Sequence, residues 1–344
     1  MIKNRKFTSH KKKIDKFFSL IAELSKVNPL ITVLILHEYF RNLYPDDLFI
    51  KKRLDTDPFK NINLVIKDLD KIGNILLKLG CYERIFSKES VDTQVLYGRL
   101  WKERFIDFSL DQKKFLKSLF NRLDFDTNKL KGKKILDMGC GSGRFTAAFA
   151  KLGAKRVYGV DLGLDGISVG KKIVKKYNLK NVTFKKSSVL NLPFKNNYFD
   201  FVFCKGVLHH TGNLKKGLDE FLRLIKKDGY GYLYLYGNGG IYWYSRKKMR
   251  KIMKIIPHEF SINVLKLYGM PAERSIFVDT WYVPIEDHVS KKFLENYLRK
   301  RNFKFKKYSK SSKPLSIELE SMEGYKHYNL MYGDGELRYL IKKI

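Results

Sequence analysis

Three glycines at alternate positions form the stretch of this chain with the clearest chemical meaning. They are Gly139, Gly141 and Gly143, and Asp137 stands two residues before the first of them. Glycine adopts positive φ and has no Cβ, so a ligand can come close to the main chain there. An apolar run precedes the glycines and an amphipathic pattern follows, which predicts a turn from a strand into a helix N-terminus with unpaired N–H groups. Such a turn can hold an extended ligand, and Asp137 suits one that carries an ammonium or a sulfonium.

The glycine spacing separates two ligand classes. A dinucleotide fingerprint requires G-x-G-x-x-G, but Arg144 occupies its last position here. An acidic residue just before the first glycine also disfavours a pyrophosphate. A nicotinamide-dependent dehydrogenase is therefore the weaker interpretation, and a tight turn without any ligand is a further alternative.

Two adjacent histidines, His209 and His210, lie in residues 204–213, CKGVLHHTGN, directly after an apolar strand pattern. An imidazole has an ordinary pKa of ~6.5 and can serve as a general base near neutral pH. The structural alternative is that one of them caps and packs the turn. Neighbouring side chains point apart and no third ligand is near in sequence, so no metal site is expected.

The elements that would position these residues change character near residue 134. Before it, the apolar residues recur with helical spacing over residues 1–95 and again over 108–123. Residues 134–237 then alternate five short strand patterns with amphipathic helices, the last helix being expected over 214–227. This alternation predicts right-handed crossovers and a parallel sheet with helices on both faces. A helix and two alternating runs after residue 288 predict an edge hairpin.

Residues 135–146, ILDMGCGSGRFT, resemble motif I of the class I S-adenosylmethionine (SAM)-dependent methyltransferases. Residues 157–163, VYGVDLG, resemble the second motif of that family, and residues 187–203 resemble the third and fourth. The resemblance continues through residues 206–237, which are similar to the ubiquinone-biosynthesis methylase subgroup. It implies an α/β, Rossmann-like doubly wound sheet of seven strands whose last strand is antiparallel.

The resemblance also implies SAM as the cofactor. Asp161 would accept hydrogen bonds from the ribose hydroxyls, a role that suits a carboxylate. The family usually has an acidic residue for the adenine amino group where this chain has Ser188, whose hydroxyl accepts without charge. The implied cofactor-binding residues are Asp137, Gly139, Cys140, Gly141, Gly143, Asp161, Leu162, Ser188, Val189 and Lys205, and the catalytic candidates are His209 and His210.

The expected domain organisation has four parts. Residues 1–95 are an N-terminal helical extension, and residues 96–237 are the SAM-binding core. Residues 238–288 are an insertion that covers the substrate, and residues 289–344 complete the core sheet.

The insertion permits two interpretations. Tyr242, Trp243 and Tyr244, followed by several Lys and Arg residues, could form a lid with aromatic walls and a basic rim. Farther along, Trp281, Tyr282, Asp287 and His288 would add to it. Alternatively, the insertion is a helix whose apolar face packs on the sheet edge, and that face would comprise Ile241, Met249, Ile252, Met253 and Ile256.

Missing motifs narrow the methyl acceptor. Enzymes that methylate exocyclic amines resemble one another in an (Asn/Asp)-Pro-Pro-aromatic turn after the fourth strand, where this chain has Lys-Gly-Val-Leu. No cysteine follows a proline, as it does in cytosine C5 methylation. We therefore expect O- or C-methylation of a small-molecule, lipid-linked or sugar-linked acceptor. The alternative is an RNA methyltransferase or an RNA-binding protein, and a further one is a SAM-binding protein without activity.

Composition bounds the partners and the compartment. The 344 residues carry a formal net charge of +34, which favours anionic partners unless it only reflects Lys-rich usage over the whole surface. Nucleic acid is the less favoured partner, and peripheral contact with an acidic membrane surface stays open. Three dispersed cysteines, no signal peptide and no transmembrane segment lead us to expect a cytoplasmic protein.

Overall fold

The computed structural model describes residues 5–43, 63, 66–67, 112–267, 281–307 and 326–344. These residues belong to two compact units, and each is described by itself. The first unit takes its residues from Met1–Val91, Asn238–Val283 and Ile317–Gly335. The second takes them from Asp92–Gly237, Pro284–Ser316 and Glu336–Ile344.

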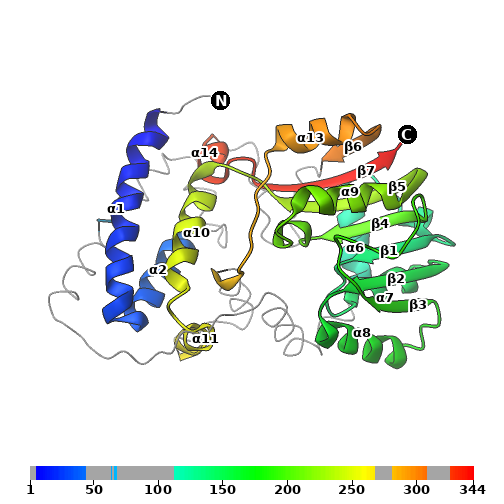
Figure 1. Cartoon of the computed structure of the whole chain (residues 1–344), viewed down its shortest axis with the longest axis horizontal. Coiled ribbons are helices and arrows are strands. Elements are labelled where there is room, and N and C mark those ends of the chain that lie inside the picture. Colours follow the sequence, from blue (N-terminus) through cyan, green and yellow to red (C-terminus); the bar gives the residue numbers. More distant parts are fainter. Residues whose placement is uncertain (1–4, 44–62, 64–65, 68–111, 268–280, 308–325) are drawn as a thin grey trace. The chain divides into compact units, whose positions relative to one another are not determined.

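The second unit contains a 7-stranded sheet in the order β3-β2-β1-β4-β5-β7-β6 (Figure 1). Its first five strands pair in parallel, whereas β7 pairs antiparallel with both β5 and β6. The predicted doubly wound sheet with an antiparallel last strand is therefore confirmed. The strands are β1 (Lys134–Met138), β2 (Arg156–Asp161), β3 (Val182–Lys186), β4 (Phe199–Lys205), β5 (Ile225–Tyr236), β6 (Phe303–Lys307) and β7 (Glu336–Lys343).

Helices cover both faces of this sheet because alternate residues of each strand point to opposite sides. Phe201 and Phe203 of β4 pack into one cluster with Phe120 of α6 (Gln112–Asn121) and Phe149 of α7 (Arg144–Lys151). Helix α8 (Leu164–Lys176) packs against α7 on that side. The alternate β4 residues pack into a second cluster with α9 (Leu214–Leu224) and α13 (Lys291–Arg299) on the other side.

The sheet order places a topological switch point at β1. Its two neighbours, β2 and β4, lie on opposite sides of it. Helix α7, which follows β1, and helix α9, which follows β4, pack on different faces of the sheet. Ligands of open parallel sheets bind beyond the carboxyl ends of the strands at such a point. The fold therefore brings the ends of β1, β2 and β4 together, and these ends carry the predicted site residues.

Helix α9 is shorter than the sequence pattern predicts. It ends at Leu224, and β5 begins at Ile225. Ile225 pairs with Phe199, after which the register shifts and Asp228 adopts a φ of +60°. Ile225 lies seven residues after Leu218, so it continues the apolar face of a helix, and it also suits a buried strand position. Its pairing with Phe199 places it in the strand.

The first unit is built from helices whose aromatic residues face inward. It contains α1 (Arg5–Val27), α2 (Pro29–Leu43), α10 (Gly240–Met253), α11 (His258–Leu267) and α14 (Tyr328–Tyr332). The Oη of Tyr39 and the Oγ of Ser245 share a hydrogen bond of 2.7 Å, and Nε1 of Trp243 donates to the Tyr332 carbonyl at 3.0 Å. The five residues of the predicted apolar face, from Ile241 to Ile256, are all buried.

The structure bears on two further expectations from the sequence, the aromatic lid and the N-terminal helical pattern. Tyr242 and Trp243 are 2% and 4% exposed, so their rings pack inside the first unit. From residue 44 on, the helical pattern expected over residues 1–95 lies outside the described residues, except at residues 63, 66 and 67. Among the residues that are described, no helix is both long enough and apolar enough to span a bilayer.

Candidate functional site

The glycine loop lies between the end of β1 and the start of α7. Gly139, Gly141 and Gly143 have φ values of +79°, +51° and +69°, so all three need the left-handed region that glycine enters without strain. The amides of Gly139 and Cys140 both donate to the carbonyl of Val160 in β2, at 2.8 and 2.9 Å. The loop is therefore fixed to the neighbouring strand by its main chain.

Close packing gives Gly139 a second reason to be glycine. A Cβ at this position would lie 2.4 Å from Cγ2 of Val207, in the turn after β4. The loop and that turn are thus in direct contact. Any ligand that lies along the loop would also meet the residues that follow β4.

Asp161 ends β2 and connects the loop to the next helix. Its Oδ2 accepts from the Gly141 amide at 2.8 Å, and its Oδ1 accepts from the Gly163 amide at 2.9 Å. Each carboxylate oxygen has two lone-pair positions, so both oxygens can still accept from the two hydroxyls of a ribose. Leu162, which follows, is 38% exposed.

Asp137 lies beneath the loop and is almost completely buried. It is 2% exposed, and its Oδ2 accepts a hydrogen bond of 2.6 Å from Oγ1 of Thr146 in α7. Burial raises the pKa of Asp137 to about 7, an effect that the Thr146 hydrogen bond reduces and the negative charge of Asp161 increases. A buried carboxyl with a pKa near neutrality responds to any cation placed beside it.

Ser188 and Val189 follow β3 in a turn that is held next to Asp161. The Ser187 amide donates to the Asp161 carbonyl at 3.0 Å. The Ser188 hydroxyl accepts from the Leu190 amide at 3.2 Å, and the Val189 side chain is buried in the core. The predicted adenine-recognition residues thus lie near the predicted ribose carboxylate.

Two further predicted residues lie at the strand ends. Cys140 is 6% exposed, and burial raises the pKa of its thiol well above the usual value, so it contributes main chain rather than a nucleophile. Lys205 ends β4, with its Nζ 5.6 Å from the ring centroid of Phe145 and 5.8 Å from that of Tyr234.

The two histidines have different surroundings. His209 is fully buried, and its ring stacks on Tyr236 with 3.8 Å between the centroids. His210 is partly exposed, and its Nδ1 lies 2.8 Å from the carbonyl oxygen of Ile285. A carbonyl only accepts, so Nδ1 is the donor, and in the neutral ring Nε2 then carries the lone pair. The geometry assigns this tautomer.

Residues 285–289 pass beside this turn and place a buried carboxylate there. The Asp287 amide donates to the His209 carbonyl at 2.7 Å, and Nδ1 of His288 lies 2.7 Å from the Gly237 carbonyl. The Glu286 side chain is 1% exposed and lies 3.2 Å from Nε2 of His288. Sequence reasoning assigned Asp287 and His288 to a lid and overlooked Glu286; the only signal was a cluster of titratable residues directly after Pro284.

Strands β5 and β7 add a polar cluster that sequence reasoning did not find. Tyr234 donates its hydroxyl to Oε1 of Glu336 at 2.5 Å, and Nη2 of Arg338 lies 2.5 Å from Oε2 of the same carboxylate. Tyr234 and Arg338 are register partners, so pairing of distant segments forms this cluster. Across the described part of the chain, no group of three or more His, Cys, Asp or Glu residues is arranged to hold a metal ion.

Comparison with known proteins identifies the family of this region. A family model described as "Methyltransferase domain" matches residues 129–238, which include β1 to β5 and the whole glycine loop. The motif resemblance, the strand order and this match agree. Residues 129–238 are a methyltransferase domain and belong to the class I SAM-dependent methyltransferases.

Three relatives show how far the similarity reaches. The chain is 35% identical over 104 residues to a demethylmenaquinone methyltransferase of Geobacillus sp. (strain WCH70), covering 30% of this chain and 44% of the relative. It is 30% identical over 129 residues to a tRNA U34 carboxymethyltransferase of Campylobacter hominis, covering 37% and 45%. It is 29% identical over 96 residues to the uncharacterized methyltransferase YcgJ of Bacillus subtilis (strain 168), covering 28% and 38%.

The chain thus matches less than half the length of each of these relatives. The solved structure of YcgJ is 17% identical and covers 66% of this chain and 98% of its own, with a TM-score of 0.37. The fold assignment rests on the strand order of the sheet.

Proposed function

We propose that the chain binds SAM at the carboxyl ends of β1 and β2 and transfers its methyl group to an oxygen or carbon atom of a small-molecule, lipid-linked or sugar-linked acceptor. The observation that carries the proposal is the bridge from Asp161 to the Gly141 amide. This hydrogen bond fixes the main chain of the glycine loop relative to the Asp161 carboxylate, which can accept from two hydroxyls.

The donor groups present fit the parts of SAM. The loop Gly139–Gly143 offers main chain to the methionine part, Asp161 and Leu162 would hold the ribose, and Ser188 and Val189 would contact the adenine. Asp137 would lie close to the cationic part, and Lys205 lies at the end of β4. When bound, SAM supplies a methyl group that its sulfonium already activates.

The protein then has to position the acceptor and accept any proton that it loses. We assign the general-base role to Nε2 of His210, because the Ile285 carbonyl fixes the opposite ring nitrogen as the donor. His209 is buried against Tyr236, so we assign it the packing role. Only one of the two predicted catalytic histidines is therefore retained as a base.

The preference for a small-molecule acceptor is supported by the demethylmenaquinone methyltransferase relative and by the absence of the amine-methylation motif. The tRNA U34 carboxymethyltransferase relative favours RNA as the second candidate acceptor. The high positive charge agrees with this second candidate. Cytoplasmic localisation remains a part of the proposal.

The test is methyl transfer from labelled SAM to a host-cell extract, with label counted separately in metabolites, lipids, protein and RNA. Label in the metabolite or lipid fraction supports the proposal, label in RNA supports the second candidate, and no transfer contradicts both. Asp161→Asn should weaken SAM binding by about tenfold or more, since it removes a charged acceptor. Asp165→Asn is the matched control, because Asp165 is an exposed carboxylate on α8.

A further inference from the structure

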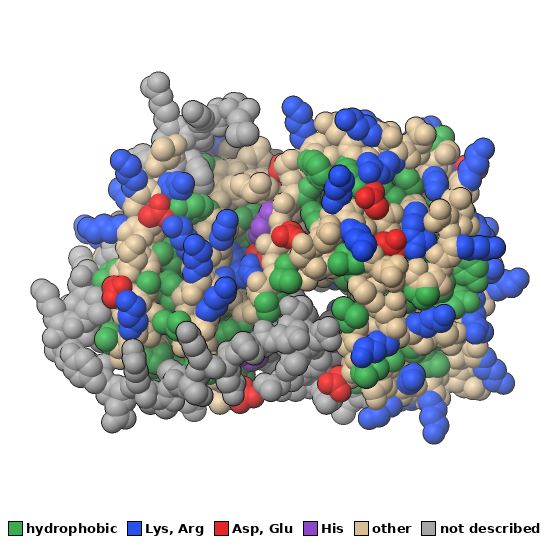
Figure 2. Space-filling view, in the orientation of Figure 1, with side chains coloured by type: hydrophobic (Ala, Val, Ile, Leu, Met, Phe, Trp, Pro, Cys, Tyr) green, Lys and Arg blue, Asp and Glu red, His purple; other side chains and the backbone are tan. Residues whose placement is uncertain are grey.

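Basic residues are distributed unevenly over the two helical layers of the second unit. The layer α6–α7–α8 carries nine Lys and Arg residues, three on α6, two on α7 and four on α8, against the single carboxylate of Asp165. The opposite layer, α9 and α13, carries six cations and three carboxylates. Two of those carboxylates form ion pairs within their own helices, Glu220 with Arg223 and Glu295 with Arg299. Lys and Arg also outnumber Asp and Glu on the face of the molecule that Figure 2 shows, so the positive charge is not confined to α6, α7 and α8. The helices of the first layer thus carry a net charge of +8 and those of the second layer a net charge of +3.

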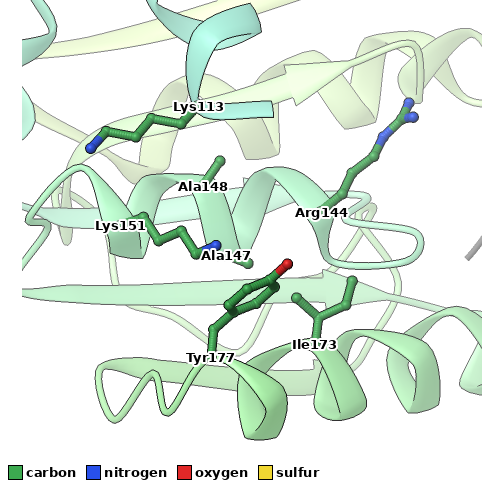
Figure 3. Close-up of a pocket in the computed structure, with 7 residues that line it drawn as sticks. All are labelled: Lys113, Arg144, Ala147, Ala148, Lys151, Ile173 and Tyr177. Atoms are coloured by element: carbon green, nitrogen blue, oxygen red, sulfur yellow. The ribbon is translucent and has the colours of Figure 1, made fainter. Parts of the chain in front are cut away.

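The basic layer contains a groove of about 130 Å³. Figure 3 shows Ile173 of α8 and Tyr177, which directly follows α8, pointing toward α7, with Lys151 at the Tyr177 ring and Lys113 extending from α6. The Nζ of Lys151 lies 3.2 Å from the centroid of the Tyr177 ring. Lys113, Arg144 and Lys151 all line this groove, and among the described residues no acidic side chain does.

We propose that this groove and the surrounding α6–α7–α8 layer bind single-stranded nucleic acid. Arg144 and Lys151 begin and end α7, so they are on the order of 10 Å apart along the helix axis. Successive phosphates of one nucleic-acid strand can contact both. Lys151 lies over one face of the Tyr177 ring. A base can therefore stack on the opposite face of this ring, or on the same face once Lys151 turns away to contact a phosphate.

The apolar residues of the layer argue against an acidic membrane as its partner. A helix that lies on a membrane inserts an apolar face between the lipids. Here the apolar faces are used for packing, as Leu116, Phe120 and Phe149 show by being buried. Of the large apolar side chains described on these three helices, only Leu164, the first residue of α8, is exposed. The surface therefore attracts anions without an apolar face to insert.

The experiment measures binding of a fluorescein-labelled single-stranded RNA of about 20 nucleotides by fluorescence anisotropy at several salt concentrations. The test variant is Lys113→Gln/Lys151→Gln. The matched control is Lys215→Gln/Lys216→Gln, which removes two exposed lysines from α9 on the opposite layer. Loss of two phosphate contacts should lower the salt slope of log affinity by about 1.4, which corresponds to about 25-fold weaker binding near 0.1 M salt. The control should bind as the unmodified chain does.

Three results would overturn the proposal: no saturable RNA binding, equal losses in both double variants, or binding only to vesicles of phosphatidylglycerol and phosphatidylcholine. A thermal melt verifies that the variants fold. The proposal is independent of the methyl acceptor and of SAM binding. The Lys113→Gln/Lys151→Gln variant should bind SAM with unchanged affinity in a calorimetric titration. This measurement distinguishes a failure of the RNA-binding proposal from a failure of the proposed methyltransferase function.

Discussion

The affinity of the chain for SAM should rise about tenfold between pH 6 and pH 8. The reason is Asp137, whose pKa burial raises to about 7. A sulfonium or ammonium beside this carboxyl favours its ionised form. With a pKa of 7, roughly 9% of Asp137 is ionised at pH 6 and roughly 91% at pH 8. If SAM binds the ionised form, its apparent affinity follows this fraction, and the tenfold change equals about 1.4 kcal/mol.

Isothermal titration calorimetry measures this dependence directly. At pH 7, binding should release about half a proton for each SAM bound, which appears as a difference in heat between buffers of different ionisation enthalpy. Asp137→Asn preserves the shape of the side chain and an oxygen for Thr146, but it cannot titrate. The variant should bind SAM more weakly at pH 8 and lose the pH dependence. A flat affinity in the unmodified chain, or an unchanged slope in the variant, would refute the assignment of Asp137 to the cationic part of SAM.

Three further predictions concern the same site. Gly139→Ala should abolish most SAM binding and lower the melting temperature, because its Cβ would lie 2.4 Å from the Val207 side chain. Gly132→Ala is the control for backbone strain alone, since Gly132 has a similar φ of +70° but open space around it. Equal effects of the two substitutions would contradict the packing argument. His210→Gln should lower the rate of methyl transfer by about 10² or more with unchanged SAM affinity; an undiminished rate would remove His210 as the base. Without SAM, the free energy of unfolding should fall as the pH rises from about 4 to about 7, because buried Asp137 keeps a proton that the unfolded chain has lost. In thermal melts over this range, Asp137→Asn should therefore gain stability relative to the unmodified chain as the pH rises.

The sequence predicted the sheet because its signals are local. Alternation of strands and helices, the glycine turn and the acid at the end of β2 each occupy a few consecutive residues. The seven strands and the antiparallel last strand followed from the family resemblance, and the observed sheet confirms both. The predicted boundary between α9 and β5 was wrong, because Ile225 fits the periodicity of a helix and of a strand. Only its pairing with Phe199 assigns it to β5.

The site was less accessible to sequence reasoning wherever distant segments meet. Nothing in residues 284–289 indicates that Glu286 would be buried beside His288, because this depends on the main-chain bonds to Gly237 and His209. The Tyr234–Glu336–Arg338 cluster likewise needs β7 beside β5. His209 and His210 are the same residue type, so the sequence does not show that they differ in burial. The conformation of the turn after β4 determines this difference.

The most direct measurement is a calorimetric titration of the intact chain with SAM and with its demethylated product, S-adenosylhomocysteine. The account predicts saturable binding of both at one site, and a loss of about tenfold or more in Asp161→Asn but not in Asp165→Asn. If neither compound produced a binding heat, or if Asp161→Asn bound SAM as well as the unmodified chain, the carboxyl ends of β1 and β2 would not be the cofactor site.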